Sequence, residues 1–490
     1  MIEALVIAAP ACAILTGAAT WFARTARQAD VVNLVGAALT AALSLALAVI
    51  GVADAGDPHH GAWWVLDAAG GVFLAVIAVI GLLSALVAPA QLAASGRGLV
   101  TAARGRSMYY VAFYAFWAAL LLIPLVDNLG LAWLLVEATT GASALLVAYS
   151  GTRGALEAGW KYLVLTTFGL AVAMLGIIVL YVAIAPNGGA LATLDWQSIA
   201  RAAPRLADGP AVVAFVLIVA GLATKIGWAP VHNWLPDAHS EAPPAVSALL
   251  SAALLPTVVL VVWRVLATLG PALAPGTASA LVLAFGLVSL AVAVPFLWRS
   301  MAWKRLLAYS SLEHMGVLAI GIGFATPLAT AGVIVHVAGH ALAKSLGFYA
   351  AGPMLRHAPR AHERAVRGLA FANPPTATAA GVSIGALAAM PPSPLFVSEL
   401  LILLGGITAG ETAVTIIAAL LLALGFLGLA HALIDVLVGE PRVKRWRSAR
   451  SARRLNRLTA VCGVLMLALT IVAITLPGSA TVEHLMAGIR

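Results

Sequence analysis

Long apolar stretches separated by short polar stretches repeat from one end of the chain to the other. Runs of about 18 or more apolar residues are long enough for a helix to cross a bilayer. The pattern therefore predicts an all-α polytopic membrane protein with about 14 transmembrane helices. The first run has no basic stretch before it, which favours a spanning helix over a cleaved signal. The predicted spans are residues 3–22, 31–53, 65–92, 108–126, 129–149, 161–185, 211–229, 245–268, 278–298, 303–323, 326–351, 374–405, 411–438 and 458–477.

The charged residues are few and unevenly distributed. Only 10% of the 490 residues are charged, against about 25% in an average soluble domain. If alternate loops face the same side, one side holds about 22 of the 28 Lys and Arg residues, so it is cytoplasmic and both termini lie outside. The basic stretch before the last span then touches anionic lipid, and the net charge of +9 does not indicate nucleic-acid binding. We expect a bacterial cytoplasmic membrane protein, with one short amphipathic helix in the outer loop "DWQSIARAAPRLADG".

Two spans are interrupted by prolines beside an ionisable residue. Span 7 ends in "TKIGWAPVHNWLP", with Lys225 five residues before Pro230, and span 12 contains "AAMPPSPLFVSEL", with three prolines shortly before Glu399. Proline inside a helix frees backbone carbonyls, which neighbours or water must satisfy. Paired interrupted helices in the two halves of a chain are typical of a transport site, although membrane helices often contain proline for packing reasons alone.

Ionisable residues lie inside spans that are otherwise apolar. In "HVAGHALAKSLGF" they recur every four residues, which places them on one face of a helix. A charge at the bilayer centre costs about 2.5–3.5 kcal/mol on insertion scales, so such residues face a protein interior or water. Burial disfavours the charged forms of Lys and Glu, and His already titrates near neutral pH, so the set can relay protons. Any one of them alone could be structural. The set comprises Glu137, Lys225, Glu313, His314, His336, His340, Lys344 and Glu399.

Other site chemistries are poorly supported by the sequence. His336 and His340 have zinc-ligand spacing, but no third ligand is evident nearby. "GHALAKS" lacks the second glycine and the preceding strand of a phosphate-binding loop. Cys12 and Cys462 lie in the first and last spans, without a cysteine or histidine cluster. We therefore predict no catalytic site, no cofactor and no metal site in this chain. Whether the chain serves in an enzyme stays open.

Two cytoplasmic loops are richer in polar residues than a simple tether. One carries His232, Asp237 and His239 within "VHNWLPDAHSEAPP", and the other leads to Lys161 in "GTRGALEAGWKY". These residues could cap helices and shape turns around the prolines. Alternatively, they form a vestibule for proton uptake, in which Glu313 and His314 of span 10 also modulate transfer.

The same stretches resemble the antiporter-like subunits shared by respiratory complex I, multisubunit sodium/proton antiporters and energy-converting hydrogenases. The resemblance covers roughly residues 100–440. Its markers are "VE" in span 5, "TKIGWAPVHNWLPDAHSEAPPAVSALLSAAL", "KRLLAYSSLEHMG", "HVAGHALAKSLGFYAAG" and "PPSPLFVSEL". The variants "SLEHMG", "LPDAHSEAP" and "FVSEL" look most like membrane subunits of hydrogenase-4 and formate hydrogenlyase, particularly those of the component F type.

The resemblance implies a fold and a division of the chain. Spans 4–8 and 9–13 would form two inverted five-helix repeats, with helices 7 and 12 broken. The corresponding segments are residues 1–100 for three N-terminal helices, 101–270 and 271–440 for the two repeats, and 441–490 for a basic cytoplasmic segment and helix 14.

The resemblance also implies roles for individual residues. Glu137 would bias the charge of Lys225, the proton carrier of the first half-channel, and Glu399 would lie near the outlet. His336, His340 and Lys344 would form the polar helix-11 connection between them. Many relatives carry His or Lys in helix 8, where this chain has Ser251. Since Ser holds no net proton at neutral pH, transfer past Ser251 would depend on water.

These observations favour a proton-translocating membrane subunit of a hydrogenase-4-like, formate-hydrogenlyase-like or complex-I-like redox assembly. Its partners would be other membrane subunits and a soluble redox arm with nickel–iron or iron–sulfur centres. One alternative is a stand-alone or multisubunit cation/proton antiporter subunit. Another is a non-conducting scaffold for a soluble redox arm, to which the serine at position 251 gives some weight.

Overall fold

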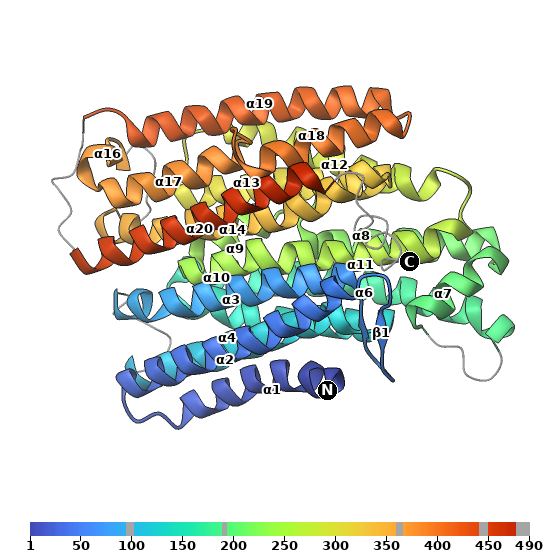
Figure 1. Cartoon of the computed structure of the whole chain (residues 1–490), viewed down its shortest axis with the longest axis horizontal. Helices are drawn as coiled ribbons and strands as arrows, with labels where there is room; N and C mark the ends of the chain where they lie inside the picture. Colours follow the sequence, from blue (N-terminus) through green and yellow to red (C-terminus); the bar gives the residue numbers. More distant parts are fainter. Residues whose placement is uncertain (95–101, 189–193, 359–365, 441–448, 477–490) are drawn as a thin grey trace.

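The computed structural model is almost entirely helical and describes residues 1–94, 102–188, 194–358, 366–440 and 449–476 (Figure 1). Its principal helices are α1 (Ile2–Trp21), α2 (Ala26–Ala53), α3 (Ala68–Ala94), α4 (Ala102–Leu122), α5 (Leu129–Val147), α6 (Arg153–Gly188), α7 (Trp196–Ala202), α8 (Asp208–Ile226), α9 (Leu235–Glu241), α10 (Pro244–Leu249), α11 (Leu255–Leu269), α12 (Thr277–Leu297), α13 (Trp303–Phe324), α14 (Pro327–His357), α16 (Leu369–Ala372), α17 (Pro374–Leu387), α18 (Pro394–Thr408), α19 (Thr412–Leu437) and α20 (Ala449–Thr475).

The number of membrane crossings agrees with the sequence pattern. Within the described residues, 13 helices are long and apolar enough to cross a membrane. A further crossing is divided between α17 and α18, which are too short individually because the chain is interrupted between them. Together they account for the predicted 14 spans, and the all-α polytopic fold is confirmed.

Polar N-cap residues mark where several helices begin. Thr25 and Gln28 form a reciprocal capping box at the start of α2, and the Asn128 side chain accepts the amide of Leu131 at the start of α5. Ser393 caps α18 and is followed by Pro394, whose missing N–H costs nothing at a first helical position. These caps satisfy backbone donors at helix ends that lipid cannot solvate.

The helices lie side by side, and the two ends of the bundle differ (Figure 1). The start of α1, the C-terminal end of α20, a two-stranded hairpin and α7 all lie at one end. The C-terminal ends of α3 and α14 and the short α16 lie at the other. Arg356 of α14 and three arginines of α20 line one cavity there, so we call this the basic end. The hairpin, formed by β1 (His59–His60) and β2 (Val65–Leu66), was not predicted, whereas α7 is a short helix in the loop for which one was expected.

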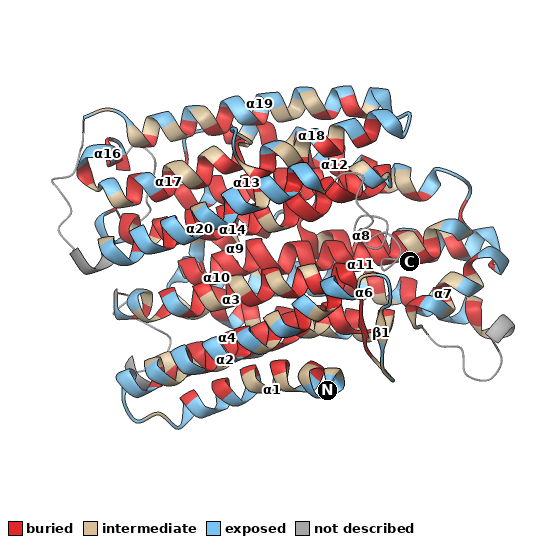
Figure 2. Ribbon diagram, in the orientation of Figure 1, coloured by how far each residue is buried: buried red, intermediate tan, exposed pale blue. Residues whose placement is uncertain are grey.

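Burial increases from the rim to the centre of the bundle (Figure 2). The apolar windows of α13 and of the crossing that contains α10 and α11 are 100% buried, and that of α14 is 94% buried, against 28% for α19 and for α20. The rim helices therefore present apolar faces to lipid. The central helices are enclosed by protein on all sides, and α13 and α14 carry five of the eight ionisable residues predicted inside the spans.

Three of the central helices are irregular. The chain breaks between α8 and α9, where Gly227 has φ +78°, a conformation that glycine adopts without strain. It breaks again between α17 and α18. Between α10 and α11 one turn is a π-helix, Leu250–Leu254, and it contains Ser251. The predicted interruptions of helices 7 and 12 are thus confirmed, and the π turn is an addition.

Candidate functional site

A first polar cluster surrounds Lys225 in the last turn of α8. The Lys225 side chain is fully buried, and its Nζ donates to Thr140 Oγ1 of α5 and to Tyr162 Oη of α6, both at 2.6 Å. Tyr162 Oη lies 2.8 Å from Ser143 Oγ. Two hydroxyl groups, one from α5 and one from α6, therefore solvate the amine in the place of water, and Ser143 supports one of them.

Glu137 belongs to this cluster through a hydroxyl bridge. Thr140 Oγ1 lies 3.4 Å from Glu137 Oε2, and Thr167 Oγ1 donates to Oε1 at 2.8 Å. Because Lys225 Nζ lies 2.6 Å from the same Thr140 hydroxyl, the carboxylate and the amine are no more than about 6 Å apart. The two groups are close enough to interact electrostatically, but they are not a direct ion pair.

Two tryptophans hold the break that follows Lys225. Trp234 Nε1 donates to the Thr224 carbonyl at 2.6 Å, and Trp228 Nε1 donates to the Met315 carbonyl of α13 at 2.8 Å. Both indoles are fully buried. Trp234 satisfies a carbonyl of the last turn before the break, and Trp228 joins the break to α13, so an irregular backbone is tolerated at membrane depth. The predicted site residue His232 lies in the same break with a half-exposed side chain, outside the buried cluster.

A second polar cluster joins α13, α14 and α18 around three histidines. His314 Nδ1 lies 3.1 Å from His336 Nε2, and His336 Nδ1 lies 2.9 Å from Ser398 Oγ. The ring centroids of His314 and His340 are 5.2 Å apart. All three rings are buried, and both ring nitrogens of His340 and Nε2 of His314 have no hydrogen-bond partner within the described chain. The two histidines of α14, His336 and His340, therefore form a compact group of imidazoles with His314 of α13.

Lys344 lies one turn further along α14. Its fully buried Nζ donates to the Leu307 carbonyl and to Ser310 Oγ of α13, both at 2.7 Å. The adjacent hydroxyl, Ser311 Oγ, lies 2.8 Å from Ser251 Oγ in the π turn. Ser251 therefore lies beside the polar row as a hydroxyl and supplies no titratable group.

Two carboxylates mark the far end of the row. Glu313 and Glu399 line a cavity of about 150 Å³ between α13, α18 and α19. Glu313 is 3% exposed, and its Oε2 has no hydrogen-bond partner among the described residues. A Cβ on Gly425 of α19 would come within 1.9 Å of Glu313 Oε1. Glycine at position 425 therefore makes room for the carboxyl group.

His239 lies between the cluster around Lys225 and the cluster on α13 and α14. Its position in a loop of the sequence did not indicate this role. The buried imidazole lies 5.4 Å from the Phe348 ring of α14 and 6.4 Å from the Trp234 ring, which in turn lies 4.7 Å from Tyr162. Both nitrogens of His239 have no hydrogen-bond partner in the described residues. His239 is thus linked to the Lys225 cluster through Trp234 and Tyr162, and to α14, which carries Lys344, through Phe348.

The remaining predicted loop residues lie at the basic end of the bundle. Lys161 forms ion pairs with Glu157 at 2.5 Å and with Asp237 at 3.6 Å, and Asp237 also pairs with Arg305 at 3.3 Å. Next to them is a cavity of about 800 Å³ lined by Glu241, Lys304 and Arg305, among others. The buried Lys304 donates to the Ala242 carbonyl. Lys304 was not among the predicted site residues.

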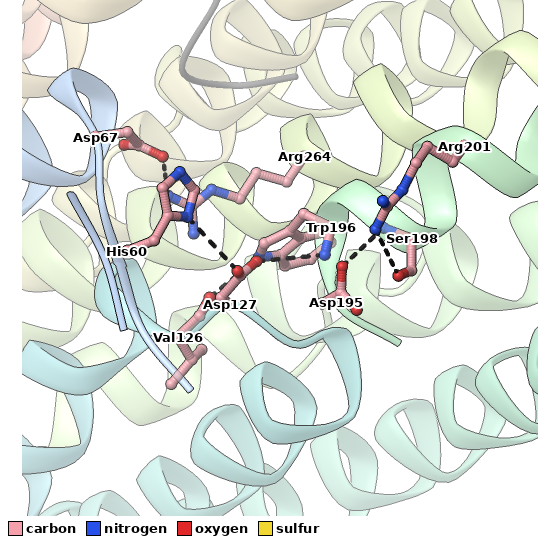
Figure 3. A network of polar contacts seen from close by, with 9 residues as sticks. All are labelled: His60, Asp67, Val126, Asp127, Asp195, Trp196, Ser198, Arg201 and Arg264. Atoms are coloured by element: carbon pink, nitrogen blue, oxygen red, sulfur yellow. Dashed lines mark hydrogen bonds and ion pairs between the residues drawn. The ribbon is translucent and has the colours of Figure 1, made fainter. Parts of the chain in front are cut away.

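A buried ion pair at the opposite end was also missed. Arg264 of α11 lies 2.6 Å from Asp67, whose other oxygen accepts the Gly70 amide at the start of α3, and both side chains are 3% exposed or less (Figure 3). The Arg264 guanidinium lies 5.8 Å from the Trp196 ring of α7. His60 reaches Asp127 at 3.9 Å nearby (Figure 3). The network ties the hairpin, α7 and α11 together.

One trio within the described residues has the spacing of metal ligands. Single ligand atoms of His314, His336 and Glu399 lie within 4.8 Å of one another. Both nitrogens of His336 already take part in hydrogen bonds, to His314 and to Ser398. A metal would have to replace one of these bonds, so the arrangement suits a proton relay better than a metal centre.

Comparisons with known proteins identify the family of this chain. The family described as NADH:quinone oxidoreductase/Mrp antiporter, TM, matches residues 126–428. A hydrogenase-4 component F homologue from Methylacidiphilum infernorum is 33% identical over 318 residues, which cover 64% of this chain and 66% of that protein.

Two solved structures share the fold. The membrane-bound sulfane sulfur reductase, an archaeal respiratory membrane complex, contains a chain with a TM-score of 0.86 at 19% identity, covering 100% of this chain and 97% of that one. The Mrp complex from Dietzia sp. gives 0.82 at 19% identity, covering 99% of both chains.

Proposed function

This chain belongs to the NADH:quinone oxidoreductase/Mrp antiporter family, and we propose that it moves protons across the cytoplasmic membrane as one subunit of a redox-driven complex. The observation that carries the proposal is a row of ionisable groups through the bundle, most of them buried and two of them, Glu137 and Glu399, partly exposed. It runs from Glu137 and Lys225 through His239 to Lys344, then through the histidines of α13 and α14 to Glu313 and Glu399.

Each group in the row can release a proton and accept another. A protonated Lys225 is stabilised by the Thr140 and Tyr162 oxygens and by the nearby Glu137 charge. Weakening the interaction with Glu137 favours release toward His239, whose neutral ring has a free acceptor nitrogen. Water molecules bridge neighbouring groups of the row that are too far apart for a direct hydrogen bond. Lys344 and the histidines then pass the charge to the two carboxylates.

Proton uptake belongs to the basic end of the bundle. The cavity beside Glu241 and Lys304 lies at that end, and Lys161 and Asp237 form ion pairs at its side. We place this end in the cytoplasm because of its basic loops, which leaves both termini outside. Glu399, with its partly exposed side chain, is the outlet group.

The proposed partners are other membrane subunits and a soluble redox arm of the hydrogenase-4 or complex I type. The similarity to a hydrogenase-4 component F homologue supports this choice. The test is to tag the chain in its own host, extract it in mild detergent and identify what co-purifies. Metal-carrying soluble subunits in a stable complex are expected. If the chain comes alone, or only with small membrane proteins, the redox assignment is wrong.

A cation/proton antiporter is the second candidate, because the fold is also that of a chain in the Mrp complex. The two functions differ in what drives the proton. A sodium gradient imposed on inverted vesicles without any redox substrate would acidify or alkalinise the lumen only if the chain is an antiporter. We expect no pH change in that assay and a clear one after a redox substrate is added.

A further inference from the structure

Ser251 lies in an unusual turn at the centre of the bundle. The crossing that contains α10 and α11 widens into a π turn over Leu250–Leu254, where the Leu255 amide donates to the Leu250 carbonyl. Pro256 follows directly. It has no N–H to donate, and its ring would clash with the carbonyl one turn earlier. Pro256 therefore accounts for the widened turn, a kind of turn that is frequent at functional sites.

The Ser251 hydroxyl belongs to a chain of hydrogen bonds that reaches the Lys344 amine. Ser251 Oγ lies 2.8 Å from Ser311 Oγ of α13, and Ser311 Oγ donates to the Leu307 carbonyl at 2.8 Å. The same carbonyl accepts Lys344 Nζ at 2.7 Å. A hydroxyl group has only one hydrogen to donate. Because Ser311 donates its hydrogen to Leu307, the hydrogen between the two serines comes from Ser251.

The Leu307 carbonyl is shared by three donors. Residue 307 lies inside α13, so its oxygen also faces the main-chain amide of residue 311. A carbonyl oxygen has two lone pairs, so the Ser311 hydroxyl competes with the Lys344 amine for this acceptor. Ser251, Leu307, Ser311 and Lys344 are all fully buried, so bulk solvent does not offer the amine a replacement.

The two serines have a second arrangement with their oxygens in the same places. If Ser311 turns its hydrogen toward Ser251 Oγ, the Leu307 carbonyl loses one donor and binds the Lys344 amine more strongly. The Ser251 hydrogen can then point to a carbonyl one turn earlier in its own helix, as serine hydroxyls in helices do. Rotation of two hydroxyl groups therefore changes how well the site holds a charged amine, without any movement of the backbone.

We propose that Ser251 is a positioning residue for Lys344, acting through Ser311 by setting how strongly the Leu307 carbonyl binds the protonated amine. The inference deepens the proposed function, because Lys344 belongs to the proton row. When Ser311 donates to Ser251, Lys344 holds its proton. When Ser311 donates to Leu307, Lys344 releases the proton more easily. Ser251 thus influences transfer without carrying a proton itself.

The other titratable groups near Lys344 belong to α9, α13 and α14. They are His239, Glu313, His314 and His340. All four are unchanged in the variants that test the proposal. A difference in the charge of Lys344 between these variants therefore reports on the serine hydroxyls.

The test reads the charge of Lys344 directly. The chain has five lysines, so the full chain labelled with nitrogen-15 at the lysine side chains gives few signals in solid-state NMR in lipid bilayers. The Lys344 signal is the one that Lys344→Arg lacks. Ser251→Ala leaves Ser311 bonded to Leu307, so the pH at which this signal changes from ammonium to amine should fall by about half a unit. Ser311→Ala frees the carbonyl and should raise that pH by about the same amount.

The opposite directions of the two shifts distinguish positioning from a merely structural role. Ser251→Thr keeps the hydroxyl and should behave like the wild type. Ser345→Ala is the matched control and should cause no shift, because the buried Ser345 hydroxyl donates to the Leu342 carbonyl of its own helix. Shifts in the same direction for Ser251→Ala and Ser311→Ala, or no shift in either, would overturn the proposal. The measurement needs no pumping, so its failure is distinct from a failure of the proposed function.

Discussion

Replacing Glu137 with Gln removes one charge from the centre of the bundle and little else. The amide oxygen of Gln can still accept the 2.8 Å hydrogen bond from Thr167. The carboxylate and the Lys225 amine are joined through Thr140 and lie at most about 6 Å apart. At an effective dielectric constant of about 20, unit charges at that distance interact by roughly 3 kcal/mol.

A loss of about 3 kcal/mol changes the balance between the charged and neutral forms of Lys225 by roughly a hundredfold. We therefore expect Glu137→Gln to slow redox-driven proton pumping at least about tenfold, because reloading of Lys225 becomes limiting. The assay is the initial rate of internal pH change, reported by a dye, in proteoliposomes that contain the purified assembly. Glu411→Gln, in an exposed turn before α19, is the charge-matched control. Wild-type pumping by the Glu137 variant, or an equal loss in the control, would refute the reasoning.

Three further predictions concern other parts of the bundle. His239→Gln should reduce pumping about tenfold without releasing partner subunits, and unchanged pumping would exclude His239 as the link between the clusters. Gly425→Ala should impair pumping, because the new methyl group would collide with Glu313; normal pumping would show that this carboxyl group is not needed where it lies. Asp67→Asn should destabilise the protein by about 3 kcal/mol or more by leaving Arg264 buried without its charge partner, measured as a lower thermal unfolding temperature in detergent. In the same assay, changing both residues to apolar ones of similar size should restore most of the stability, and no recovery would contradict this account of the pair.

The arrangement of spans could be predicted because lipid imposes a simple rule. A crossing helix must be long and apolar, so hydropathy alone locates it. Even the interrupted crossing formed by α17 and α18 was visible, since its prolines and Glu399 stand out against apolar neighbours. The hairpin at residues 59–66 was not predicted, because four strand residues in a short polar loop carry no periodic pattern. The division into two repeats stays a prediction.

The sequence predicts which site residues lie close together when they share one helix. It does not predict this when the residues lie on different helices. The four-residue spacing of His336, His340 and Lys344 required them to share a face. The position of His239 depends on how α9 packs against α14, and a loop sequence does not contain that information. Arg264 and Asp67 are 197 positions apart, and each on its own looks like a residue near the end of a span. Pairing across such distances is fixed only by the packing of the whole bundle.

The central claim is that protons pass through Lys225, and its most direct test is pumping by Lys225→Ala. The assembly that contains this variant, reconstituted in proteoliposomes, is supplied with its redox substrate while electron transfer and internal pH are recorded together. The account predicts that proton translocation is abolished and that electron transfer by the partner subunits changes less. Full pumping per electron by Lys225→Ala would contradict it.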